Sequence, residues 1–219
     1  MGNPTLLAFD TSAAHCAAAL LRGGRILVSR RVEMGRGQAE QIVPLLEDLL
    51  EEGGTDWRGL DAVGVGVGPG NFTGIRISVA LARGLALGLG VPAIGVSSFE
   101  ALAEGEEGPV LVSLSAPRGS VYLQAMVHGR DVSAPIQIAP EAVAELTLAP
   151  GTRVIGAQAG ILGAGLGLPA LPRGIDDIAP RIARVAAARL GEAQPRPAPL
   201  YLRPADAAPP SDPPPVILP

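Results

Sequence analysis

Apolar residues in the first fifty positions form three short runs followed by one helical pattern. The runs at 5–10, 16–21 and 26–32 are separated by polar or glycine-containing turns, which predicts three strands of an antiparallel meander. Between positions 40 and 52, apolar residues recur at i, i+3, i+4 and i+7. This spacing predicts an amphipathic helix, which glycines end. Its apolar stripe consists of Ile42, Leu45, Leu46 and Leu49.

A strand, a glycine-rich turn and a helix follow directly. Residues 63–67 are an apolar run, residues 68–74 (GPGNFTG) form the turn, and a helix is expected from about Ile75 to Leu89. Another strand is expected at 91–96. Because backbone N–H groups point outward at the start of a helix, this geometry suits an anion, but it is also an ordinary corner of an α/β protein. The pattern leaves both interpretations open.

The same order of elements begins again near position 105. Apolar runs at 110–114, 121–127 and 132–138 predict a second meander, and a shift of 105 residues places Ser115 on Asp10. A short helix at 140–146, a strand at 153–156 and a helix at 178–190 follow. We therefore expect two similar α/β domains, residues 1–104 and a smaller one at 105–203, with a proline-rich tail at 204–219. Chance similarity between hairpins is the alternative.

Composition narrows the classes of function. All 17 basic residues are arginine, so P-loop phosphate binding and lysine Schiff-base chemistry are excluded. The net charge of −4 and a pI near 5.2 give no basic nucleic-acid footprint. Cys16 is the single cysteine, so no intrachain disulfide forms. Arg76 and Arg83 interrupt the apolar helix at 75–89, and we expect a cytoplasmic protein without a membrane partner.

Four motifs resemble one protein family. The run from Gly68 to Arg76 (GPGNFTGIR) is similar to the GPGSFTGIR signature of the tRNA threonylcarbamoyladenosine biosynthesis protein TsaB family, also called YeaZ. LAFDTS at 7–12, RGSVY at 118–122 and LYLR at 200–203 also resemble this family, in the same order. The resemblance implies the ASKHA fold of actin-like ATPases: two RNase H-like domains, each a mixed five-stranded-type sheet flanked by helices, the second reduced.

The resemblance also implies a function. TsaB-like proteins resemble the catalytic TsaD subunit, which transfers a threonylcarbamoyl group to N6 of adenosine 37 in tRNAs that read ANN codons. We expect a non-catalytic scaffold that pairs with a TsaD-like subunit, helps recruit a TsaE-like ATPase, and meets tRNA only through the complex. In isolation the chain is expected to form a homodimer. The alternatives are a nucleotide-dependent transferase or hydrolase of the same fold, or an M22-type metallopeptidase.

The cleft loops supply a candidate nucleotide or anion site. It would be built from Asp10, Thr11, Ser12, Gly68, Gly70, Asn71, Thr73 and Gly74. In active members of the superfamily an Asp of each half organises a magnesium nucleotide, but Ser115 stands where many TsaB sequences carry the second Asp. The site is therefore expected to be vestigial, with at most weak or interface-bound ATP or ADP and Mg²⁺. The alternative is that these side chains only close a turn.

Candidate catalytic and metal-binding residues are few. The catalytic relative holds a metal with paired histidines on the helix that corresponds to 38–50, and this chain has none there. His15 and His128, the two histidines present, are expected in exposed hairpin turns, too few for a catalytic zinc site. Cys16 lies in an apolar run and is expected to be inert. We predict no catalytic residue and no metal ligand.

The two helices of the first domain carry more apolar surface than one contact requires. On the helix after the glycine turn, small and large residues share a face that also contains two arginines. We predict that this face and the stripe of the 40–52 helix bind a partner through Ile42, Leu45, Leu46, Leu49, Arg76, Ile77, Ala80, Leu81, Arg83 and Gly84. The alternative is that the chain's own sheet covers both helices.

Overall fold

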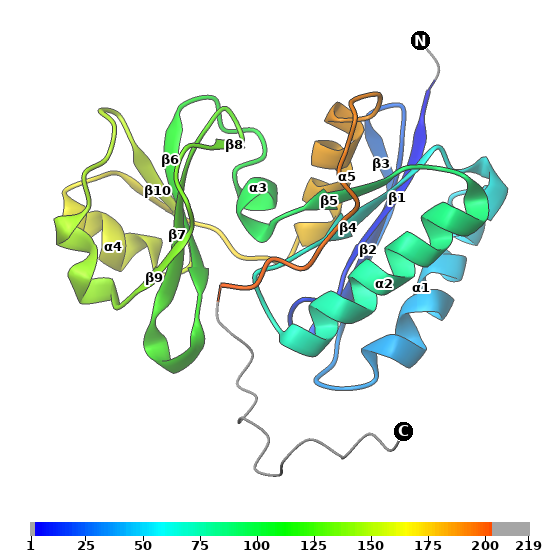
Figure 1. Cartoon of the computed structure of the whole chain (residues 1–219), viewed down its shortest axis with the longest axis horizontal. Helices are drawn as coiled ribbons and strands as arrows, with labels where there is room; N and C mark the ends of the chain where they lie inside the picture. Colours follow the sequence, from blue (N-terminus) through cyan, green and yellow to red (C-terminus); the bar gives the residue numbers. More distant parts are fainter. Residues whose placement is uncertain (1–2, 203–219) are drawn as a thin grey trace, which may run out of the picture.

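The computed structural model describes residues 3–202, which form two sheets side by side (Figure 1). The first sheet has the order β3-β2-β1-β4-β5. β1 and β2, and β2 and β3, pair antiparallel, whereas β4 is parallel to both β1 and β5. Its strands are β1 (Thr5–Asp10), β2 (His15–Arg22), β3 (Arg25–Glu33), β4 (Ala62–Gly66) and β5 (Ala93–Val96).

The second sheet repeats this order with its own strands, β11-β10-β6-β7-β8, and β9 also pairs with β7. β6 is antiparallel to β7 and parallel to β10, as β1 is to β2 and β4. The strands are β6 (Pro109–Ser115), β7 (Val121–Val127), β8 (Arg130–Asp131), β9 (Ile136–Ile138), β10 (Arg153–Gly156) and β11 (Ala170–Pro172). The predicted fold class of two related α/β halves is confirmed.

Helices separate the sheets and cover their outer faces. In Figure 1, α1 (Gln38–Glu52) and α2 (Phe72–Leu89) lie outside the first sheet, and α4 (Ala159–Leu166) lies outside the second. Between the sheets lie α3 (Ser98–Leu102) and α5 (Ile178–Ala188). Short 3-10 turns occur at Trp57–Gly59, Pro117–Gly119 and Pro140–Glu145. The molecule is thus a stack of helix, sheet, helix, sheet and helix layers.

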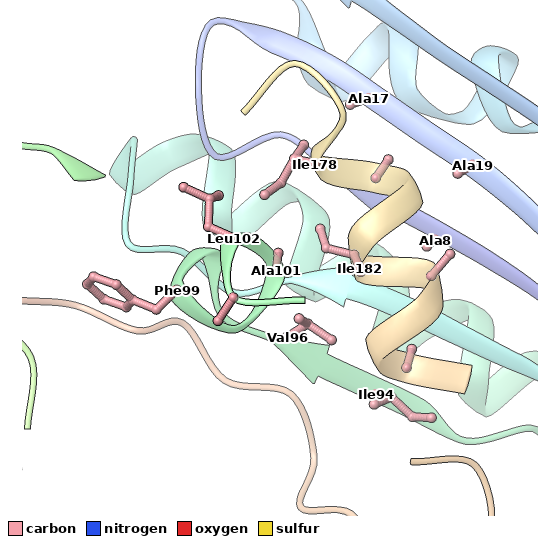
Figure 2. Close-up of a cluster of buried hydrophobic side chains, with 14 of the residues drawn as sticks. Ala8, Ala17, Ala19, Ile94, Val96, Phe99, Ala101, Leu102, Ile178 and Ile182 are labelled. Atoms are coloured by element: carbon pink, nitrogen blue, oxygen red, sulfur yellow. The ribbon is translucent and has the colours of Figure 1, made fainter. Parts of the chain in front are cut away.

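Each layer boundary is a hydrophobic core. Side chains alternate along a strand, so Leu7 and Phe9 of β1 face α1 and α2, whereas Leu6 and Ala8 face α5. The central core joins both sheets, and Figure 2 shows Ile178 and Ile182 of α5 in it, near Leu102 of α3. A third core lies between the second sheet and α4. Because both faces are covered, β1 is buried throughout.

Helix α5 follows the second sheet in the chain but packs on the first. Its contacts are with β1, β2 and β4, where Gly64 brings backbone and helix together: a Cβ there would lie 3.1 Å from the Ala186 Cβ. Residues 178–188 therefore return to the half formed by residues 1–104. The boundary at 104/105 stays a prediction, and the proposed tail at 204–219 lies outside the described residues.

The structure differs from the expected elements in four places. Helix α2 begins at Phe72, so the last residues of the expected turn form its first turn. Of the strand expected at 132–138, residues 136–138 form β9 and residues 132–135 lie outside any strand, and the expected helix near 140–146 is a 3-10 turn. Helix α4 and strand β11 were not expected. The α4 sequence, AGILGAGL, is apolar all round and contains three glycines, so it carries no amphipathic period.

Helix α2 is long and apolar enough to cross a membrane by length and composition alone. Helices that flank a sheet can meet the same criterion. Here α2 packs against β4 and β5, and Ser78 on its inner face donates a hydrogen bond to the Gly66 carbonyl at 3.2 Å. We therefore interpret α2 as the outer helix of the first sheet.

Candidate functional site

The turn after β1 and the glycine loop after β4 are locked together by hydrogen bonds. The Asn71 N–H donates to the Ser12 carbonyl at 2.6 Å, and the Thr11 hydroxyl donates to the Gly74 carbonyl at 2.7 Å. Thr11 and Ser12 are both buried. The structure therefore brings the two candidate loops together, and their polar groups bind each other.

The glycines of the loop permit this close contact. A Cβ on Gly74 would lie 1.9 Å from the Thr11 carbonyl oxygen, and one on Gly70 would lie 2.2 Å from that of Ser12. Gly68 has φ of 91°, which side-chain-bearing residues rarely adopt. All three glycines thus have a structural reason to be glycine.

Several polar groups at the start of α2 are already used within the protein. Asn71 caps the helix because its side-chain oxygen accepts the Gly74 N–H at 2.8 Å. The Ile75 N–H donates to the Asn71 carbonyl, and the N–H of Asn71 itself is used by Ser12. Thr73 is exposed in the first turn. The loop therefore works as a helix cap and a contact to β1.

Asp10 is completely buried at the end of β1. Its Oδ1 accepts three hydrogen bonds: from the Ser12 N–H at 3.0 Å, the Ser12 hydroxyl at 2.8 Å and His15 Nε2 at 2.9 Å. Its Oδ2 has no partner among residues 3–202 and sits against Gly66, where a Cβ would lie 1.9 Å away. This carboxylate organises its own turn.

The expectation that His15 is an exposed turn residue is wrong. His15 is the first residue of β2 and is fully buried beside Asp10. Since a carboxylate only accepts, Nε2 carries the proton, and Nδ1 has no partner within the described chain. No sequence signal indicates this pairing, because turn composition indicates exposure, whereas contact with Asp10 depends on how the hairpin folds. His128 is exposed on its turn, as expected.

A cavity of about 500 Å³ lies between the halves. It is bordered on one side by Ser12 and Asn71, and on the other by Ser113 and Ser115. Ser113 is fully buried and its hydroxyl has no partner among residues 3–202. The positively charged residue in the lining of this cavity is Arg173. Its guanidinium already donates hydrogen bonds to the Leu102 carbonyl and to Glu106.

The residues of this cavity offer few ligands for a magnesium nucleotide. Asp10 is fully buried and outside the cavity lining, with three donors on Oδ1 and with Oδ2 against Gly66, and Ser115, the last residue of β6, offers only a hydroxyl. Arg173 is held by Glu106. Among residues 3–202, no group of three His, Cys, Asp or Glu side chains is placed to hold a metal ion. These residues do not fit Mg²⁺ with a triphosphate, so no chemical step is derived through one.

Cys16 is the remaining nucleophile in this region. It is fully buried in β2, and burial together with the nearby Asp10 charge raises the pKa of its thiol to about 11. The thiol donates weakly to Met34 Sδ at 3.5 Å. A thiol with this pKa stays protonated at neutral pH and is a poor nucleophile.

The predicted partner surface is only partly at the surface. The α1 stripe of Ile42, Leu45, Leu46 and Leu49 is buried in the core under the first sheet, so these four residues are removed from the candidate surface. The stripe is amphipathic because it faces β2, not a partner. On α2, Ile77 and Leu81 are half-buried against the same core. Four predicted α2 residues are exposed: Arg76, Ala80, Arg83 and Gly84.

The exposed face of α2 is apolar and has open space beside its glycines. Leu87 is 84% exposed, and nothing lies within 4 Å of a Cβ placed on Gly84 or Gly88. The solvent-exposed side of α1 is acidic, with Glu40, Glu47, Asp48, Glu51 and Glu52 exposed and Glu52 paired with Arg30 of β3. An exposed glycine inside a helix costs roughly 0.5–1 kcal/mol relative to alanine. No contact within residues 3–202 explains Gly84 or Gly88.

The fold defines the class of protein. Two sheets of equal strand order, each begun by an antiparallel meander, are the ASKHA fold of actin-like ATPases. Component A of (R)-2-hydroxyglutaryl-CoA dehydratase from Acidaminococcus fermentans has the same fold, with a TM-score of 0.54 over 85% of this chain and 97% of that one. At 11% identity, this likeness shows the fold alone.

Sequence comparisons narrow the class to one family. Residues 33–169, more than half of the chain, match the family model described as TsaD: tRNA N6-adenosine threonylcarbamoyltransferase. The structure of YeaZ from Pseudomonas aeruginosa has a TM-score of 0.68 at 30% identity, and covers 91% of this chain and 100% of that one. The chain therefore belongs to the TsaB/YeaZ proteins of the TsaD family.

The similarity to TsaB of Escherichia coli is 38% identity over 123 residues. This alignment covers 53% of the present chain and 52% of the relative. The alignment with TsaB from Haemophilus influenzae has 34% identity and covers 56% of that protein. The matching part thus spans about half the length of these curated relatives.

Replacement of His15 tests the buried pair. In His15→Ala, Asp10 Oδ1 loses one of three donors and a cavity forms beside it. We expect the free energy of unfolding in urea to fall by about 2–4 kcal/mol, as for other broken buried polar pairs. His128→Asn, at an exposed turn with positive φ that asparagine tolerates, should change it by less than about 0.5 kcal/mol. Equal losses in the two variants would contradict the buried pairing.

The thiol pKa makes a separate prediction. With a pKa of about 11, roughly one Cys16 thiol in a thousand is ionised at pH 8. The folded protein should therefore not react with a thiol-specific disulfide reagent within minutes, whereas urea-unfolded protein should react with one equivalent. A Ser115→Cys variant, exposed at the cleft, should release one fast equivalent while folded. Fast labelling of the folded wild-type chain would refute the prediction.

Proposed function

We propose that this chain is a non-catalytic accessory subunit in the formation of threonylcarbamoyladenosine at position 37 of tRNAs reading ANN codons. It binds a TsaD-like catalytic subunit through the exposed face of α2 and helps recruit a TsaE-like ATPase. tRNA is contacted through the complex, in the cytoplasm. Without its partner the same face joins two copies of the chain. Family membership is the starting point of this proposal.

The outer face of α2 is the observation that carries the proposal. It exposes Leu87 almost fully and presents Ala80, Gly84 and Gly88 in one row at intervals of four residues. Small residues let a second helix approach closely, and the space beside both glycines is open. Arg76 and Arg83 border this row on the solvent side. Such a row is unfavourable in an isolated helix and becomes useful once another helix packs on it.

The chemistry of the cleft supports an accessory role. Asp10 accepts hydrogen bonds from Ser12 and His15, and the Asn71 N–H of the glycine loop donates to the Ser12 carbonyl. Cys16 lacks thiolate character. A transferase would need a polar group free to touch the reacting atoms. Asp10 and Cys16 are committed to the fold. The Ser113 and Ser115 hydroxyls line the cavity, but no His, Asp or Glu of residues 3–202 lines it with them to act as a base.

A nucleotide-dependent enzyme is the second candidate, and the cavity between the halves favours it. Its volume of about 500 Å³ falls within the range of small-molecule sites. This candidate requires the isolated chain to bind ATP tightly in the presence of Mg²⁺ and to convert it. Calorimetry with Mg²⁺-ATP and a phosphate-release assay on the chain alone separate the two functions.

Reconstitution tests the accessory role. The purified chain is combined with its cognate TsaD-like and TsaE-like proteins, tRNA and the threonylcarbamoyl donor, and the modified nucleoside is measured by mass spectrometry. We expect the product to fall at least tenfold when the chain is omitted and to return when it is added. Addition of the heat-unfolded chain is the control. Equal product without the chain would reject the proposal.

Gly84→Leu separates docking from stability. Because a side chain at Gly84 meets open space, the melting temperature of the isolated chain should stay the same or rise slightly. The affinity for the TsaD-like subunit, measured by calorimetry, should fall at least tenfold, because the new side chain keeps the partner helix away. Gly160→Leu on α4 is the matched control, since its surroundings are equally open. Undiminished affinity in Gly84→Leu would exclude this face.

A further inference from the structure

Arg76 is held by two aromatic side chains, one of them from the far end of the described chain. The guanidinium carbon lies 3.7 Å from the centre of the Phe72 ring, one helical turn earlier on α2. The Arg76 Nε–H donates to the Tyr201 hydroxyl at 2.8 Å. The rings of Phe72 and Tyr201 are 4.8 Å apart at 32°. We call these three side chains the arginine clamp.

The chain end brings Tyr201 to this position by a strand-like alternation. Leu200 donates its N–H to the Val67 carbonyl at 2.8 Å, beside the glycine loop. Leu200 and Leu202 pack against the central core, so Tyr201 between them points outward and remains 40% exposed. The LYL part of the C-terminal motif therefore attaches the chain end to the first half and carries one outward ring. Arg203 of that motif lies outside the described residues.

The clamp leaves a defined part of Arg76 free. Nε is used by Tyr201, and no ion pair to Arg76 is formed within residues 3–202. The two terminal nitrogens form a planar fork that binds a carboxylate through two parallel hydrogen bonds. An unrestrained arginine side chain loses rotamer entropy when it is ordered. The clamp already restricts the Arg76 side chain, so less rotamer entropy remains to be lost on binding.

We infer that the arginine clamp presents the terminal fork of Arg76 to a carboxylate of the partner protein, and that Tyr201 is a positioning residue for this contact. The inference rests on the proposed function and adds the chemistry of one contact to it. The clamp stands at the start of α2, on the same helix as the exposed Ala80, Arg83 and Gly84. Arginine and tyrosine are enriched among the residues that dominate binding energy.

A protein carboxylate fits this surface better than an RNA phosphate. The chain carries a net charge of −4, and the exposed side of the neighbouring helix α1 carries acidic residues, among them Glu40, Glu47 and Glu51, that repel a phosphate backbone. The α2 face that continues from the clamp is apolar and small, which is suited to a helix of a folded partner. RNA binding is therefore an outcome of the test and not part of the inference.

A double-mutant cycle tests the inference. The affinity of the full-length chain for the cognate TsaD-like subunit is measured by calorimetry for wild type, Tyr201→Phe, Arg76→Ala and the double variant. Tyr201→Phe keeps the ring and removes one hydrogen bond to a charged group, so we expect roughly threefold to tenfold weaker binding. In the Arg76→Ala background the same change should have no further effect. Tyr122→Phe, at the other tyrosine of the chain, is the matched control.

The outcomes separate this inference from the function on which it rests. A weaker Tyr201→Phe complex, with an unchanged melting temperature and no added loss in the double variant, supports the clamp. Equal affinities of wild type and Tyr201→Phe, or the same loss in both backgrounds, overturn it while the accessory function stands. No binding of the wild-type chain to the partner overturns both. If Arg76→Ala weakens binding to unmodified tRNA but not to the partner protein, the surface recognises RNA and the inference is wrong.

Discussion

The contact between the turn after β1 and the glycine loop after β4 sets the position of much of this protein. Asp10 collects three donors at one oxygen, which fixes the turn so that the carbonyls of Thr11 and Ser12 face the loop. Gly70 and Gly74 are pressed against those carbonyls, and Asn71 then starts α2. Because the loop cannot shift without breaking buried hydrogen bonds, the direction of α2 follows from this contact.

The same contact links the fold to the proposed role. The two loops that could bind an anion in the cleft are instead hydrogen-bonded to each other. The cleft therefore still contains a cavity, but Arg173, the cation in its lining, is already paired. Helix α2, started by the loop, keeps an outward face of small and apolar residues that the rest of residues 3–202 leaves uncovered. Tyr201 returns to the start of this helix and orders Arg76. The surface best suited to binding another protein is therefore the outer face of α2 and not the cleft.

The duplicated topology can be predicted from the sequence because it depends on short-range patterns. Apolar runs, turns and one strongly periodic helix indicated the order of elements in both halves, and GPGNFTGIR indicated the family. Elements without such a pattern were missed: α4 is apolar on all sides, and β11 is three residues long. Residues 132–135 of the strand expected at 132–138 lie between β8 and β9 and belong to neither.

Burial was the harder part to predict. Ile42 and its neighbours formed a stripe wide enough for a partner, yet the first sheet covers it completely. His15 stood in a polar turn, yet the pairing of β1 with β2 places it against Asp10. Arg76 was a candidate by its position on the helix, while its two aromatic neighbours, one of them 125 residues away, were not foreseen.

The sequence by itself determined the class of fold, the family and the absence of lysine chemistry, since these rest on local periodicity, motif spacing and composition. Only the tertiary structure decided which polar groups are used up inside the protein and which remain available outside it. The physical reason is that hydrogen bonds such as those from His15 to Asp10 and from Arg76 to Tyr201 join residues from different elements. Because this geometry forms only when the layers pack, it cannot be predicted from residues that are adjacent in the sequence.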